Sequence, residues 1–343
     1  MTPDYYKNRD LAVTHRRINP FAALAYAAFT SVAAVGYALY TAPDDAETLN
    51  TLIPFADIPA KGDKRLQSII ATIRQSPEGE ALYQHAASTG AVFEWRPRNP
   101  LAPLGTYESG LTTMQADHTK SRTVLAIVHE LYHHWQGETL KPHQWKLDPV
   151  DRYHLARMVE VDACAKTAIF AAAHADATGK PLPPIKNAQS AFGDKIAEDY
   201  ARRAKTTRLY LHDTYEKCFA EINAPVFHQY QKTHISIMTR PAYAALDALK
   251  KSDVKNLETV FNTHFKTATL AEKAKLFRSF FVTDTKTGTI HPDIAAMDDA
   301  DFMGWIETQS RSAENAAVQE TQNAFNYYRQ VIKDSLPAPK PGS

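Results

Sequence analysis

The feature that constrains this chain most is the pentapeptide HELYH at 129–133, which places two histidines one helical turn apart. In an α-helix, residues four apart differ by about 40° around the axis and lie about 6 Å apart along it. The imidazoles of His129 and His133 therefore point the same way and can bind one tetrahedral metal ion at about 2.0–2.1 Å. Glu130 is rotated by about 100° from His129. It can thus reach a water molecule on the metal without binding the metal, which suits a general base.

The residues around the pentapeptide predict a helix from about 121 to 136. Apolar residues recur at helical spacing and mark a buried stripe: Val124, Val128, Leu131 and Trp135. Gly137 would then stand just past the helix end. The alternative is a pair of surface histidines with a chance glutamate, because such a pattern arises in roughly one chain in thirty or forty of this length. His134 faces away from His133, so we expect it at the surface or behind the ligands.

The next predicted helix begins with Asp148 as N-cap and Pro149 at its first position, and it stops by Gly179. It carries Glu160, which is 27 residues after His133. An antiparallel pair of helices would bring this carboxylate to the metal. Alanines surrounding Glu160 favour close packing, and a carboxylate buried there needs a partner or a metal ion. The alternative for Glu160 is a surface acid or an ion pair.

Other residues on these segments are weaker candidates. Asp162 is the second candidate for the third ligand, but it lies about 200° from Glu160 around the helix, so both cannot face one ion. Asp162 is therefore expected to orient another group or to flank the helix. His143 and His154 are further alternatives on spacing alone.

An acyl-transfer site also needs a group that stabilises the oxyanion. Tyr153 and Arg157 precede Glu160 on its face of the helix, and either could serve. The alternative for Arg157 is a structural ion pair. Cys164 lies one turn after Glu160 and is expected to be a small buried packing residue. The sequence leaves open whether it pairs with Cys218 or stays free.

The segments HELYHHW (129–135) and E-x-D-A (160–163) resemble the gluzincin type of the zincin superfamily. More narrowly, they resemble a family of bacterial metallopeptidases of unknown function. The resemblance covers about 90–175. It implies a zinc ion on His129, His133 and Glu160, with Glu130 catalytic. It also implies a small antiparallel sheet, whose edge strand within 105–115 aligns an extended substrate.

One departure from the gluzincin pattern E-x-x-x-D affects the support of the metal ligands. Cys164 stands where the aspartate would be. Another group must then orient a ligand histidine. The metzincin continuation is absent as well, because Gln136 and Thr139 occupy the positions of its glycine and third histidine.

The amino end contains an uncharged stretch without proline, Phe21–Ala42. As a helix it would be about 33 Å long, enough to cross about 30 Å of hydrocarbon. Basic residues precede it and acidic residues follow it. We therefore expect a transmembrane helix at 19–42, a cytoplasmic segment at 1–18, and a single-pass protein with its catalytic domain on the periplasmic side. A cleaved signal peptide and an alanine-rich buried helix are the alternatives.

For the rest of the chain we expect a mainly α-helical fold with a small antiparallel β-sheet, of the α+β class. Residues 43–62 would be a linker, because prolines and a glycine interrupt them. A zincin-like metallopeptidase domain would follow at 63–235. It would begin with two helical pieces broken near Ser76-Pro77, and its strands would lie in 91–96 and 105–115. A helical extension at 236–335 and a disordered tail at 336–343 would complete the chain.

The composition excludes some functions. The net charge is +1 and no basic block with interleaved aromatic residues is present, so nucleic acid is a poor candidate partner. The sequence predicts a zinc-dependent metallohydrolase, a peptidase acting on a peptide or protein, in which Glu130 activates zinc-bound water. One alternative is a membrane-anchored helical interaction protein with a degenerate motif. Another is a zinc site kept for folding only.

Overall fold

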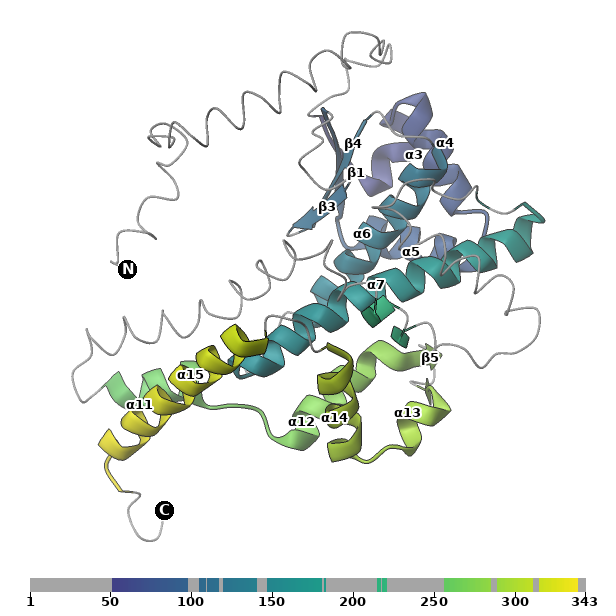
Figure 1. Cartoon of the computed structure of the whole chain (residues 1–343). Coiled ribbons are helices and arrows are strands. Elements are labelled where there is room, and N and C mark those ends of the chain that lie inside the picture. Colours follow the sequence, from purple (N-terminus) through teal and green to yellow (C-terminus); the bar gives the residue numbers. More distant parts are fainter. Residues whose placement is uncertain are drawn as a thin grey trace, which may run out of the picture. The chain divides into compact units, whose positions relative to one another are not determined.

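Two long helices, α6 (Lys120–Leu140) and α7 (Pro149–Thr178), lie against each other at the centre of the described fold (Figure 1). The structure is a computed structural model. It describes residues 51–97, 105–108, 110–116, 120–140, 147–180, 182, 215–216, 218–220, 256–284, 289–310 and 315–338. Both long helices were predicted from the sequence.

Local sequence explains where α7 begins and ends. The Asp148 carboxylate accepts a hydrogen bond of 3.0 Å from the amide of Asp151, and Pro149 occupies the first turn. At the other end, Gly179 takes a left-handed conformation with φ 66°. Helix α6 is longer than predicted, because it continues through Gly137 to Leu140. A Cβ atom on Gly137 would lie 3.0 Å from the Tyr107 hydroxyl, so this glycine permits a close approach by a neighbouring strand.

The sheet contains β1 (Leu52–Pro54), β2 (Val92–Arg96), β3 (Gly105–Glu108) and β4 (Leu111–Gln115), in the order β1-β2-β4-β3. The prediction of an antiparallel sheet is wrong, because β2 and β4 are parallel while the other two pairs are antiparallel. The hairpin explains the difference. The chain turns at Gly110, with φ 91°, between β3 and β4. Strand β4 then lies between β3 and β2, antiparallel to β3 and parallel to β2. Strand β3 is left at the edge.

Helices α4 (Lys64–Ile73) and α5 (Pro77–Ser88) share an apolar core with the sheet and α6. Their break falls at Ser76, as predicted, and the Ser76 side chain caps α5. Asp63 caps α4 through the amide of Leu66 and also accepts a 2.7 Å hydrogen bond from the Trp95 indole. A single carboxylate thus joins the start of a helix to strand β2.

The predicted linker at 43–62 belongs to the fold from residue 52 onward. Strand β1 leads into η2 (Phe55–Asp57) and α3 (Ile58–Lys61). Phe55 and Ile58 are fully buried in the core. Phe55 meets the ring of Phe93 edge-on, with 6.2 Å between centroids. The prolines in this stretch suggested an irregular lead-in, but Pro54 ends an edge strand and Pro59 lies in the first turn of α3, where neither breaks a hydrogen-bonded ladder.

The carboxy-terminal elements share a second apolar core with α7. Residues Leu155, Met158 and Val161 of α7 pack in one cluster with aromatic residues from later in the chain, Phe277, Phe280, Phe281 and Phe302. The elements described there are α11 (Leu257–Val260), η6 (Phe261–Phe265), α12 (Leu270–Arg278), η7 (Ser279–Phe281), β5 (Val282–Asp284), β6 (Thr289–Ile290), α13 (Pro292–Ala296), α14 (Asp299–Ser310) and α15 (Asn315–Ser335).

Residues 48–343 group as one compact unit, and the expected boundary near 235 stays a prediction. That boundary itself lies outside the described residues, as do the segments 1–18 and 19–42 and residues 339–343. Among the helices that the structure describes, none has the length and apolar character that a bilayer crossing requires. The transmembrane helix at 19–42 stays a prediction.

The burial of residues 52–61 leads to a prediction about stability. Phe55→Ala should lower the free energy of unfolding by about 3–5 kcal/mol, because it empties a fully buried aromatic site. Leu52→Ala, at a side chain that is 60% exposed, should change it by about 0.5 kcal/mol or less. Urea denaturation followed by circular dichroism measures both values. Equal, small effects would mean that this stretch is a linker after all.

Candidate metal centre

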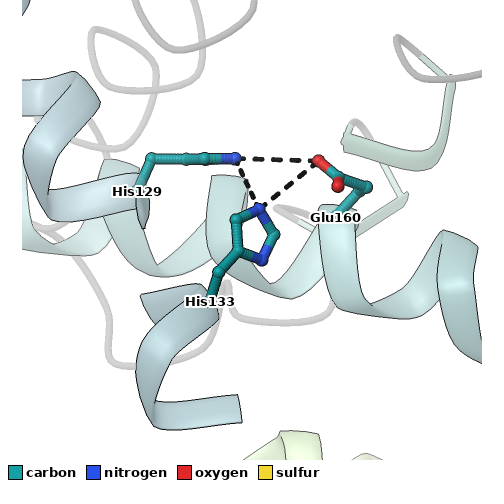
Figure 2. A group of neighbouring side chains, drawn as sticks. All are labelled: His129, His133 and Glu160. Atoms are coloured by element: carbon teal, nitrogen blue, oxygen red, sulfur yellow. Dashed lines mark hydrogen bonds and ion pairs between the residues drawn. The ribbon is translucent and has the colours of Figure 1, made fainter. Parts of the chain in front are cut away.

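Two histidines of α6 and one glutamate of α7 point toward a common position (Figure 2). The Nε2 atoms of His129 and His133 lie 3.0 Å apart. The Oε2 atom of Glu160 lies 3.7 Å from Nε2 of His129 and 3.6 Å from Nε2 of His133. In the part of the chain that the structure describes, this is the one group of three or more histidine, cysteine or acidic side chains arranged to hold a metal ion.

The triangle of donor atoms fits a tetrahedral metal ion. Ligand atoms about 2.0–2.1 Å from such an ion lie about 3.3 Å from one another. The three observed separations, 3.0, 3.6 and 3.7 Å, bracket that value. Two imidazole nitrogens and one carboxylate oxygen also match the three protein ligands of a catalytic zinc site. The structure therefore brings His129, His133 and Glu160 together as the sequence suggested.

The pKa values of His133 and Glu160 depend on each other and on His129. Burial alone would lower the pKa of His133, but the nearby carboxylates of Glu160 and Glu130 and the hydrogen bond to Gln136 raise that pKa to about 9. Burial alone would raise the pKa of Glu160, yet the two histidines hold it well below its usual range. The Glu160 carboxylate and the His133 imidazole therefore stabilise each other's charged forms.

Glu130 lies beside the ligands and is only 7% exposed. Burial raises the pKa of its carboxyl group, and the Glu160 charge raises it further, while His129 and His133 oppose the shift. A Cβ atom on Gly105 would lie 3.0 Å from Oε1 of Glu130. The absence of a side chain on Gly105 therefore makes room for this carboxylate against the first residue of edge strand β3.

The outer nitrogens of both histidines have partners. Nδ1 of His133 lies 2.8 Å from Oε1 of Gln136, and Nδ1 of His129 lies 3.7 Å from Sγ of Cys164. Cys164 is buried and forms no disulfide, and it packs as predicted in the core shared with the carboxy-terminal helices. The sequence called for another group to orient a ligand histidine. Gln136 is in that position, one turn after His133, although in the sequence it stands out only because it replaces the glycine of the metzincin motif.

His134 is not at the surface but buried at 1% exposure. Its Nε2 lies 2.6 Å from the Thr89 hydroxyl, and its Nδ1 lies 3.2 Å from the Tyr107 hydroxyl. Because Tyr107 belongs to β3, this histidine holds the edge strand against α6. Its position could not be inferred from helical spacing alone, since both partners come from elsewhere in the chain.

The remaining candidates occupy three different environments. Asp162 is fully buried and accepts a hydrogen bond from Gln136, in agreement with the expectation that it orients another group. His154 is buried with Nδ1 2.6 Å from the Ser310 hydroxyl, which joins α7 to α14. Tyr153 is buried in a small cluster with Val318 of α15. His143 lies outside the described residues.

Arg157 is fully buried near Glu160. Burial lowers the pKa of its guanidinium, whereas the Tyr153 and Glu160 charges act in the opposite direction. The role of Arg157 or Tyr153 as an oxyanion stabiliser stays a prediction.

Comparison with known proteins gives one match. The profile of a family described as "Putative metallopeptidase family (DUF6782)" matches residues 44–221, just over half of the 343-residue chain. No curated protein and no solved structure matches. The matched range contains the three side chains that converge, together with Glu130. The chain belongs to the putative metallopeptidase family DUF6782.

Proposed function

We propose that this protein is a zinc-dependent metallopeptidase of the gluzincin type, which hydrolyses amide bonds in a peptide or protein substrate. His129, His133 and Glu160 are the proposed ligands and Glu130 is the proposed general base. The observation that carries the proposal is the meeting of three donor atoms from two helices at separations of 3.0–3.7 Å. The family to which the chain belongs supports the peptidase reaction.

The donor set favours zinc over the harder cations. Magnesium and calcium prefer shells made of oxygen atoms, whereas two of the three donors here are imidazole nitrogens. Two histidines and one glutamate are the ligand set of known zinc peptidases. A bound zinc ion would supply a Lewis acid that polarises the scissile carbonyl and makes water more acidic.

Glu130 would move the proton. Its carboxylate is held beside the ligands, and burial raises its pKa toward the range in which a general base works well at neutral pH. In the proposed reaction Glu130 takes a proton from the attacking water and later gives it to the leaving amine. A side chain on Gly105 would crowd Oε1 of Glu130, so the glycine leaves this carboxylate room beside the ligands.

The substrate would lie along β3. This strand is last in the sheet order, and β4 is its partner among the described strands. An extended peptide can add to such an edge through main-chain hydrogen bonds. Because β3 begins at Gly105, beside Glu130, a peptide on this edge would pass the base. Arg157 is the better placed of the two oxyanion candidates, since its charge interacts with Glu160, whereas Tyr153 packs against Val318.

Residues 19–42 would anchor the protein in the membrane, with 1–18 in the cytoplasm and the catalytic domain at 63–235 in the periplasm. The charge difference across the apolar stretch supports this orientation. The stretch from 43 to the start of β1 at Leu52 would connect the anchor to the fold.

Metal content is the first test of the ligand set. The purified full chain should contain one zinc ion per molecule, and His133→Ala should lose it, because two ligands alone hold zinc weakly. His154→Ala removes another buried histidine of the same helix pair, one bound to Ser310, and should keep the zinc. Elemental analysis with a melting curve for each variant gives the result. Zinc retained in His133→Ala would exclude the proposed ligands.

Glu130→Gln separates a catalytic centre from a structural one. This variant should lower peptide cleavage by about 10²–10⁴-fold, the usual contribution of a general base, and it should leave the zinc content unchanged. Glu320→Gln, at an exposed position on α15, should cleave like the wild type. A peptide library read by mass spectrometry supplies the assay. Full activity in Glu130→Gln would show that another group is the base.

Membrane attachment can be tested in cells that express the full chain. The protein should stay in the membrane fraction after an alkaline carbonate wash, and a variant lacking residues 1–42 should become soluble. Protease added outside spheroplasts should digest the anchored protein, because its catalytic domain would be exposed there. A shortened chain in the soluble periplasmic fraction would instead identify residues 19–42 as a cleaved signal peptide.

A further inference from the structure

A series of buried polar groups runs from His133 into the interior, through Gln136 and Asp162 to Tyr215. We propose that Gln136 is the positioning residue that fixes the His133 imidazole for metal binding, and that Asp162 and Tyr215 hold Gln136 in place. This inference rests on the proposed function, because it concerns the same metal centre. It adds three residues, of which only Asp162 was a candidate from the sequence, as a metal ligand, and it connects the centre to the carboxy-terminal elements.

The orientation of the Gln136 amide follows from its surroundings. Nε2 of Gln136 lies 3.0 Å from the carbonyl oxygen of Val159 and 2.6 Å from Oδ2 of Asp162. A backbone carbonyl accepts hydrogen bonds and cannot donate one, and the same holds for an ionised carboxylate. The NH₂ group must therefore face α7, and Oε1 must face His133. At 1% exposure, Gln136 has little contact with water that could compete with these bonds.

This orientation determines which nitrogen of His133 carries the proton. Oε1 of Gln136 can only accept, so at 2.8 Å it requires an N–H at Nδ1 of His133. In the neutral imidazole that binds a metal, the lone pair is then on Nε2, which faces His129 and Glu160, where the proposed ligands meet. A hydrogen bond to the outer nitrogen sets the tautomer and the ring direction of a metal-binding histidine. In this chain a glutamine would do so from the same helix.

Asp162 anchors the far side of the amide. Its carboxylate is fully buried, and Lys166 balances its charge at 3.1 Å. A charged acceptor strengthens the hydrogen bond from Gln136 beyond that of a neutral one. Asp162 stands two residues after Glu160 on α7, so one short segment supplies both a candidate ligand and the support of another.

Tyr215 extends the series beyond the two long helices. Its hydroxyl donates to Oδ1 of Asp162 and lies 3.1 Å from the carbonyl oxygen of Phe280 in η7. Its ring is fully buried and lies 4.6 Å, between centroids, from the ring of Phe281. Phe280 lies past residue 221, where the family match ends. The carboxy-terminal elements would therefore support the metal centre through Tyr215, whose one hydroxyl proton goes to Asp162 and whose ring packs against Phe281.

The test is the zinc affinity of the full chain, measured by competition with a chromogenic chelator. Gln136→Met keeps the volume of the side chain but loses its polar bonds, and it should weaken zinc binding by about 10–100-fold. Tyr215→Phe removes one hydroxyl farther away and should weaken binding by about two- to tenfold. Tyr83→Phe is the matched control, because it removes a buried hydroxyl that donates to the Phe55 carbonyl away from the centre. It should leave the affinity unchanged.

A second measurement does not depend on affinity. In zinc-loaded protein with ¹⁵N-labelled histidine, the Nδ1 proton of His133 should exchange slowly with water, and in Gln136→Met it should exchange rapidly. Wild-type protein that binds no zinc would overturn both the proposed function and this inference. Zinc-binding wild type with unchanged affinity and proton exchange in Gln136→Met would overturn the inference alone. If Gln136→Met does not fold, Tyr215→Phe against Tyr83→Phe decides, and equal affinities would overturn it.

Discussion

The candidate site depends on the partly buried carboxylate of Glu160, which α7 brings into contact with α6. Removing a charged carboxylate from water costs several kcal/mol unless it is compensated. Glu160 is compensated by the two imidazoles of α6 at 3.6 and 3.7 Å. Ala163 beside it is fully buried, and Ala165 and Ala168 pack in the second apolar core. The packing of α6 against α7 and the ion pairs of Glu160 therefore depend on each other. A greater distance between the two helices would leave the Glu160 carboxylate without its histidine partners.

The sheet contributes by placing one strand beside this helix pair. Strand β3 contacts α6 at two places, and at each place one of the two contacting residues is a glycine. Gly105 makes room for Glu130, and Gly137 makes room for Tyr107. The imidazole of His134, on α6, contacts the Tyr107 hydroxyl through Nδ1 and the Thr89 hydroxyl through Nε2. Because a glycine faces a large polar side chain at each contact, strand β3 can lie close to the proposed base. A substrate strand paired with β3 would then also lie close to that base.

The features that could be predicted are those that depend on residues close to one another in the sequence. Helical spacing placed His129 and His133 on one face, and the cap at Asp148 located the start of α7. Glu160 required one further step, the energetic cost of leaving a carboxylate unpaired on an otherwise apolar helix. The parallel pairing of β2 with β4 was missed, because it depends on which side of β2 the hairpin closes, and local sequence does not carry that information. The core position of Phe55 was missed for a similar reason, because its aromatic neighbour Phe93 lies well along the chain.

Gln136 shows why the support of a metal site is harder to predict than its ligands. A ligand is recognised by its chemical type and spacing, whereas a glutamine one turn after a histidine is ordinary in a helix. Its proposed function depends on the two acceptors on α7 that orient its amide, at Val159 and Asp162. Asp162 in turn is held by Tyr215, which meets the carbonyl of Phe280. The proposed role of these residues therefore depends on which hydrogen-bond partners they have, and the residue types alone do not reveal it. The direction of the Gln136 amide is set by α7, and Tyr215, whose ring packs against Phe281, links this proposed support to the second apolar core.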